Sequence, residues 1–218
     1  MSRTRELAGG GREVEVEPDR LDRFCAGVAE RHGAVLHTVV DVHRTRLDTE
    51  DGTTVEIVPT VAGLEPGSVA GLWLAPLHAH LALPHRVGLL LVRAGGHTAG
   101  VAVQGRVQTS STARRHVQGR TAAGGWSQQR FARRRAGQTR RALEQAADTA
   151  ARTLLGLHLD VLVTGGDRRS VDIVLADPRL RALAPLLSPR WLDTPEPRRA
   201  TLDVAAERSH AVLVRLRP

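Results

Sequence analysis

The chain has 218 residues, enough for one domain or two small ones, and carries 31 basic against 23 acidic residues, every basic one an arginine. Its single cysteine excludes an intramolecular disulfide and a cysteine-based zinc site. Two Phe, three Trp and no Tyr argue against an aromatic platform that reads single-stranded bases. The N-terminus lacks the apolar core of a signal peptide and no apolar run is long enough to span a membrane, so we expect a cytoplasmic protein.

The first part of the chain predicts an arm followed by a small α+β portion. Residues 1–17 are polar and glycine-rich and are expected to form a flexible arm, with a short edge strand at EVEVE as the alternative. Residues 18–84 are expected to form the N-terminal α+β portion. Its helix starts at Pro18 and ends near Gly33, and alternating strands follow on both sides of an Asp-Gly turn. The predicted strands span 35–42, 45–47 and 54–58, and a loop spans 59–71.

Two kinds of residue in this portion invite a chemical interpretation. The histidines at 78, 80 and 85 lie close together, but no carboxylate or cysteine stands at a useful spacing, so partly buried structural imidazoles are favoured over a metal site. Cys25 falls on the apolar face of the first helix and is expected to be a buried packing residue. We therefore predict no metal and no cofactor here.

Residues 85–218 are predicted to form the second and larger domain. A continuous apolar run, a Gly-Gly-containing turn and a run of small residues indicate a central hairpin over 86–103. The further expected elements are a third strand at 107–112, a long helix at 128–157, a strand at 159–164, helices at 169–175 and 180–187, and a last strand at 211–216. Strands alternating with helices predict an α/β (α+β) fold with a mixed sheet and packed helices.

Four aspartates in the second half of this domain could together form the acidic cluster of a metal-dependent nuclease. Asp160, Asp167, Asp172 and Asp177 are spaced through one strand and the helices after it. Two of them stand where turns and helix starts use carboxylates in any case, so a nuclease is the least favoured interpretation.

Positive charge is concentrated in one segment of this domain. Eleven arginines and no acidic residue lie between Arg93 and Leu143, while the rest of the chain has 20 basic and 23 acidic residues. Self-repulsion makes such a cluster costly, whereas a polyanion would compensate it. Arginine also suits bidentate phosphate contacts. A bias of arginine over lysine explains the missing lysine but not the missing acids, so we favour a nucleic acid as partner.

The sequence Gly119–Arg141 contains the residues best suited to chemistry. Gly124 and Gly125 permit a close backbone approach to a partner, and Gln128 and Gln129 follow directly after Trp126 and Ser127. A glutamine amide cannot act as a base at neutral pH, but it can orient an attacking water. The structural alternative is a linker followed by the capped first turn of a helix. A P-loop is excluded because the Gly-Lys-Ser/Thr sequence is missing.

The run GGWSQQRFARRR resembles the GGQSALRFARLR-type motif of archaeal and eukaryotic class-one peptide release factors. The matching residues are Gly124, Gly125, Ser127, Arg130, Phe131, Ala132, Arg133 and Arg135. In that family the glycine loop enters the peptidyl-transferase centre and promotes hydrolysis of the peptidyl-tRNA ester. Here Trp126 stands at the family's glutamine position, and the displaced glutamine is similar to the bacterial branch of the VLRF-type (Vms-like) release factors. The resemblance covers about residues 86–187 and implies an RNase-H-like catalytic domain.

The resemblance implies a ribosome-associated peptidyl-tRNA hydrolase that acts in ribosome quality control without metal or cofactor. Its expected partners are the rRNA of the large ribosomal subunit and peptidyl-tRNA. The expected catalytic residues are Gly124, Gly125 and Gln128, with Gln129 as the alternative glutamine. The expected RNA-binding residues are Trp126, Arg114, Arg115, Arg120, Arg130, Arg133, Arg134, Arg135, Arg140 and Arg141. A ribosome-binding factor without catalysis is the alternative, and a metal-dependent nuclease is the less favoured one.

Overall fold

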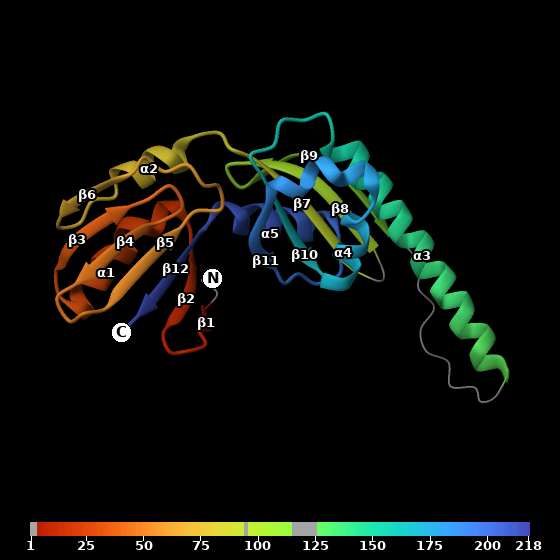
Figure 1. Cartoon of the computed structure of the whole chain (residues 1–218), viewed down its shortest axis with the longest axis horizontal. Coiled ribbons are helices and arrows are strands. Elements are labelled where there is room, and N and C mark those ends of the chain that lie inside the picture. Colours follow the sequence, from red (N-terminus) through yellow and green to blue (C-terminus); the bar gives the residue numbers. More distant parts are fainter. Residues whose placement is uncertain (1–3, 94–95, 115–125) are drawn as a thin grey trace. The chain divides into compact units, whose positions relative to one another are not determined.

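The chain folds into two compact units (Figure 1). The computed structural model describes residues 4–93, 96–114 and 126–218, except for the side chains of 114 and 126–136. The first unit, called the terminal unit, comprises Met1–His85 and Glu207–Pro218. The second, the central unit, comprises Arg86–Ala206. Among the described helices none has the length and apolarity that a membrane span requires.

The terminal unit is built on an antiparallel sheet of seven strands in the order β1-β2-β12-β5-β4-β3-β6. The strands are β1 (Thr4–Glu6), β2 (Arg12–Val16), β3 (Val35–Val40), β4 (Thr45–Thr49), β5 (Thr54–Val58), β6 (Gly67–Ala70) and β12 (Val212–Arg217). The helical segments are η1 (Pro18–Arg20), α1 (Leu21–His32) and α2 (Ala75–Ala82). The α+β character expected of this part of the chain is therefore confirmed.

Apolar periodicity explains the core of the terminal unit. Leu21, Cys25 and Val28 recur at helical spacing on α1 and are fully buried. Strand residues at every second position, such as Val55 and Ile57, are buried against them. The prediction that Cys25 is a packing residue is confirmed, and burial followed by the nearby carboxylate of Asp22 raises the pKa of its thiol to about 12.

Three expectations about the terminal unit need correction. Residues 12–16 of the expected flexible arm form β2, which pairs with β1 and β12 and buries Val14 and Val16 in the core, so the alternative of a strand at EVEVE is the one found. The expected loop at 59–71 contains β6, a short edge strand paired with β3. The last strand, β12, pairs with β2 and β5 in this unit, outside the sheet of the expected 85–218 domain.

The central unit contains a mixed sheet of five strands in the order β11-β10-β7-β8-β9. The strands are β7 (Arg86–Arg93), β8 (Gly96–Val103), β9 (Arg106–Arg114), β10 (Val161–Gly166) and β11 (Leu187–Leu192). The first three in the chain form an antiparallel meander, and β10 and β11 continue the sheet parallel to β7. Numbered within the unit, the order is 3-2-1-4-5 with the second strand reversed, which is the topology expected of an RNase-H-like domain.

Helices cover both faces of this sheet. The long helix α3 (Trp126–Leu154) lies on one face with α4 (Arg168–Leu175) and η2 (Pro178–Leu186). On the other face Leu202 of α5 (Arg199–His210) reaches Gly100, where an added Cβ would lie 2.8 Å from the leucine side chain. The expected α/β (α+β) fold with packed helices is confirmed, but α5 and β11 were not predicted.

Candidate functional site

The candidate residues lie at the junction between β9 and α3. Gly124, Gly125, Arg115 and Arg120 fall outside the described residues. Arg114 is the last residue of β9. The candidates from residue 126 to residue 135 form the first turns of α3, whose backbone is helical from Trp126, two residues before the predicted start. They are Trp126, Gln128, Gln129, Arg130, Arg133, Arg134 and Arg135.

The two glutamines occupy the first turn of α3. Successive residues of an α-helix are rotated by about 100°, so Gln128 and Gln129 stand at different positions around the helix axis. The positively charged residues from 130 to 135 fill the next two turns, and no acidic residue lies among them. Figure 1 shows this N-terminal part of α3 extending past the end of the sheet.

Two of the predicted RNA-binding arginines have described side chains. Arg140 and Arg141 are both exposed on α3. The Nε of Arg140 lies 3.6 Å from Oε1 of Glu144, one helical turn later, and both side chains are largely exposed. An exposed pair of this kind contributes at most about 1 kcal/mol, so it leaves the guanidinium able to exchange partners.

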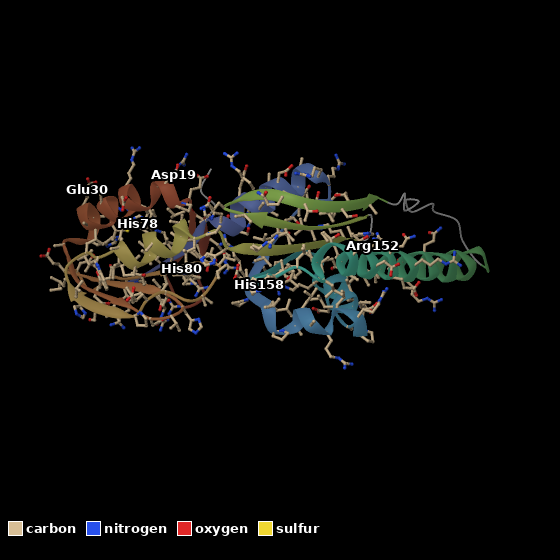
Figure 2. The ribbon with its side chains drawn as sticks, turned by 90° about the horizontal axis from the view of Figure 1, so that it is seen from above. Asp19, Glu30, His78, His80, Arg152 and His158 are labelled. Carbon is tan, nitrogen blue, oxygen red and sulfur yellow. The ribbon has the colours of Figure 1, made fainter. Side chains whose placement is uncertain are left out.

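An alanine-rich stripe fixes α3 against the sheet. Ala146, Ala147 and Ala150 are buried and let the helix approach β8 closely. One polar contact interrupts this stripe: the Nε2 of His97 on β8 lies 3.0 Å from the hydroxyl of Thr149. Burial, followed by the charge of Arg152 on the same helix (Figure 2), lowers the pKa of His97. The neutral imidazole therefore links β8 to the C-terminal half of α3, while the positively charged residues from 130 to 135 lie in the N-terminal half of the same helix.

The strand register shows what surrounds the candidate junction. Gly96 of β8 pairs with Arg93 on one side and with Arg114 on the other, so β7 and β9 finish at the same end of the sheet, with β8 between them. Gly166 at the end of β10 pairs with Val92. The chain thus leaves β9 toward the Gly-Gly sequence at the sheet end where the parallel strands β7 and β10 finish. This end is the usual ligand side of open α/β sheets.

Several residues at this sheet end were not predicted as site residues. Arg93 donates through Nε to the carbonyl of Thr194 at 2.7 Å and lies 3.2 Å from Asp193. Arg168, which begins α4, places its guanidinium carbon 4.4 Å from the ring centroid of Trp191 on β11. The pairing of β10 with β11 brings these residues together, and no local motif in the sequence signals that pairing.

The histidines at 78, 80 and 85 make structural contacts. His78 and His80 both lie on α2 (Figure 2). The ring of His78 hydrogen-bonds with Asp22, whereas the rings of His80 and His85 bond with the carbonyls of Val61 and His80. Burial lowers the pKa of His80. Within the described ranges no group of His, Cys, Asp and Glu is arranged to hold a metal ion.

Three of the four aspartates of the nuclease interpretation serve as structural hydrogen-bond acceptors, and the fourth is an exposed helix residue. Asp160 accepts from the backbone N–H of Arg86 at 2.7 Å. Asp167 caps α4 by accepting from the backbone N–H of Ser170 at 2.9 Å. Asp177 caps η2 and binds the guanidinium of Arg179, which lowers the pKa of its carboxyl to about 2. Asp172 is an exposed residue of α4.

The mixed 3-2-1-4-5 sheet, with the sequence GGWSQQRFARRR between β9 and the first turns of α3, defines a release-factor-type domain. Residues 85–215 match the model of the Actinobacteria/chloroflexi VLRF1 release factor family, and the chain belongs to this family. No curated protein matches the chain.

The chain is also similar to solved structures of archaeal proteins, at low sequence identity and low TM-score. The archaeal translation termination factor aRF1 is 12% identical with a TM-score of 0.42, and the match covers 75% of this chain and 51% of that one. Pelota of Thermoplasma acidophilum is 8% identical with a TM-score of 0.32, covering 92% and 65%. Pelota of Archaeoglobus fulgidus is 12% identical with a TM-score of 0.31, covering 94% and 64%. The chain therefore spans about half to two thirds of the length of these proteins.

Proposed function

We propose that the protein is a ribosome-associated peptidyl-tRNA hydrolase that releases nascent chains from stalled large ribosomal subunits. The single observation that carries this proposal is GGWSQQRFARRR at the junction of β9 and α3 in a member of a release factor family. The proposed substrate is the ester between the nascent peptide and the terminal adenosine of its tRNA. Such a substrate implies a cytoplasmic location.

In this mechanism the chain contributes positioning rather than a titrating group. Gly124 and Gly125 let the backbone enter a crowded RNA site, because no Cβ obstructs its approach. The Gln128 amide accepts a hydrogen bond from a water and orients its oxygen toward the ester carbonyl. Attack cleaves the carbonyl–oxygen bond, the tRNA hydroxyl leaves with a proton, and the peptide leaves as an acid. The protein's own step needs no metal or cofactor.

The basic turns of α3 supply the affinity for RNA. Arg130, Arg133, Arg134 and Arg135, with Arg140 and Arg141 after them, can neutralise phosphates of rRNA or tRNA and release counterions. Arg114, Arg115 and Arg120 extend this charge into the segment before the glycines. Trp126, at the family's glutamine position, is proposed to stack on an RNA base.

A release assay with stalled large-subunit–peptidyl-tRNA complexes tests the proposal. We expect Gln128→Ala to lose at least a hundredfold in single-turnover release, because orientation of the nucleophile contributes several orders of magnitude to such reactions. Cosedimentation with the complex should be unchanged, since the arginines remain. Gln108→Ala, at an exposed position of β9 away from the junction, is the matched control and should release normally.

The second glutamine is tested in the same assay. Gln129→Ala should retain most of the release activity if Gln128 orients the water. If Gln129 orients it, Gln129→Ala should lose release and Gln128→Ala should retain it. Release at the wild-type rate by the double variant would remove the hydrolase proposal. A chain that still binds but never releases, even as wild type, would point to a ribosome-binding factor without catalysis.

A further inference from the structure

A second basic surface lies outside the sequence motif, at the start of α4. Arg168 and Arg169 are adjacent there and both are exposed. They follow Gly166, which pairs with Val92 one residue before Arg93, and Arg93 shares its partner Gly96 with Arg114. The two arginines therefore stand at the sheet end from which the Gly-Gly segment continues.

One of these arginines is held in place by an aromatic ring. The guanidinium carbon of Arg168 lies 4.4 Å from the centroid of Trp191, whose ring packs against the core of the central unit. A guanidinium plane has two faces, and Arg168 is exposed although its guanidinium lies over the tryptophan ring, so the group stays accessible to a second planar partner. An arginine restrained in this way loses less side-chain entropy when it binds a second planar group.

The acids nearby already have other partners. Asp167 accepts hydrogen bonds from the backbone N–H and hydroxyl of Ser170, and Asp193 pairs with Arg93. Among the described residues neither Arg168 nor Arg169 takes part in an ion pair within 4.0 Å, although the charges of Arg93 and Arg169 help to lower the pKa of Asp167 after its bonds to Ser170. Two guanidinium groups at this end are thus available to an anionic ligand.

We propose that Arg168 and Arg169 form a second RNA contact, in which an unpaired base stacks on the open face of Arg168 and Arg169 binds a neighbouring phosphate. Unpaired bases stack on arginine planes as well as on aromatic rings, and arginine binds phosphate in a bidentate manner. Trp191 acts here as a positioning residue, because it orients Arg168 and does not itself touch the RNA. This proposal rests on the proposed function, because that function is the reason for expecting ribosomal RNA or tRNA as the ligand.

Binding of the whole 218-residue chain to vacant large subunits and, separately, to deacylated tRNA over a salt series tests this contact. We expect Arg168→Ala to weaken binding roughly tenfold to whichever of the two, the large subunit or the tRNA, carries the contacted RNA. Arg168→Lys should stay severalfold weaker than wild type with an unchanged salt slope, because lysine keeps the charge but lacks the plane. Arg169→Ala should lower the slope by about 1, and Arg169→Lys should restore it.

Arg106→Ala is the matched control, since Arg106 is an exposed arginine of the same sheet at the opposite end, where β9 begins beside Val103. The proposal would be overturned if the variants at 168 and 169 bound both large subunits and deacylated tRNA as the control does. Binding of Arg168→Lys at the wild-type level would overturn the claim that a base stacks on Arg168. Trp191→Leu should weaken binding as Arg168→Lys does while its thermal unfolding stays cooperative. If the variants at 168 and 169 bind normally but Gln128→Ala loses release, this contact is wrong and the proposed function is retained. If those variants bind weakly but Gln128→Ala releases normally, the contact is retained and the proposed hydrolase mechanism is wrong.

Discussion

At the scale of single residues, His97 shows how the position of α3 depends on a group without charge. The stripe of Ala146, Ala147 and Ala150 is smooth and offers little to fix the helix along its axis. The hydrogen bond between His97 and Thr149 supplies a directional contact inside this interface. Arg152 donates to the same hydroxyl at 3.4 Å and disfavours a second positive charge beside it.

The lowered pKa of His97 predicts a loss of stability in weak acid. Below the unfolded value of about 6.5, the unfolded chain binds a proton that the folded chain binds less readily, so the free energy of unfolding falls as the pH falls through 6.5. His97→Gln keeps a side chain able to bond Thr149 but cannot be protonated. We expect urea unfolding of this variant to depend less on pH between about 7.5 and about 5.5.

His80 and His210 share this direction of shift, so part of the pH dependence should remain in His97→Gln. His43→Gln, at an exposed turn position, serves as the control and should unfold with the wild-type pH dependence. Identical pH dependence of His97→Gln and wild type would show that the imidazole is not held neutral by its surroundings.

At the scale of elements, the cap of α4 connects stability with RNA binding. Asp167 stabilises the first turn of α4 through Ser170, but its charge also opposes an RNA phosphate beside Arg169. Asp167→Ser removes the charge and keeps a capping oxygen, whereas Asp167→Ala removes both. We expect both variants to bind RNA more tightly, and only the alanine variant to lose about 1 kcal/mol of stability.

Affinity for large subunits and the midpoint of urea unfolding measure these two effects separately. Asp203→Ala, a change at an exposed acid of α5 paired with Arg199, is the control for removal of one negative charge. RNA binding by Asp167→Ser that equals the binding of this control would mean that the α4 surface does not face RNA.

Elements with a strong local pattern were predictable from the sequence, and elements defined by distant partners were not. The hairpin of β7 and β8 is marked by a continuous apolar run and a glycine turn, and α3 by its repeated small residues. By contrast β11 contains Pro189, which weakens a strand prediction but is tolerated because β11 is an edge strand. The helix α5 lies in the closing segment, for which the sequence predicted only the strand at 211–216.

In the candidate site, too, the part formed by consecutive residues could be predicted from the sequence and the part formed by distant residues could not. The GGWSQQRFARRR segment is contiguous, so the sequence alone was enough to propose its chemistry. The stack of Arg168 on Trp191 joins residues from α4 and β11, and it exists only because β11 pairs with β10 beside the start of α4. No spacing in the sequence encodes that contact, since the rest of α4, η2 and the start of β11 lie between the two residues and carry no related motif.

At the scale of the whole molecule, the region that matches the family and the compact units have different boundaries. Residues 85–215 match the release factor model, but β12 near the end of that region belongs to the sheet of the terminal unit. Its partners β2 and β5 both lie before residue 85, and its Val212, Val214 and Leu216 are buried among their side chains. The terminal unit therefore depends on a strand from the opposite end of the chain.

This arrangement predicts opposite behaviour for two fragments that differ by five residues. A fragment of residues 85–210 ends with α5 and omits β12, so we expect it to remain monomeric with a cooperative thermal transition. A fragment of residues 85–215 carries most of β12 without β2 and β5, which exposes two strand edges and apolar side chains that are buried in the full chain. We expect this longer fragment to associate or precipitate.

Light scattering and size-exclusion chromatography at equal concentrations distinguish the two fragments. The full chain without residues 1–6 is the control, because it loses only β1, an exposed edge strand of three residues, and should stay monomeric. A monomeric, cooperatively folded 85–215 fragment would show that β12 does not require the terminal unit. Association of the 85–210 fragment as well would instead show that the central unit needs the terminal unit to fold, because its own sheet and helices would then be insufficient for an independent core.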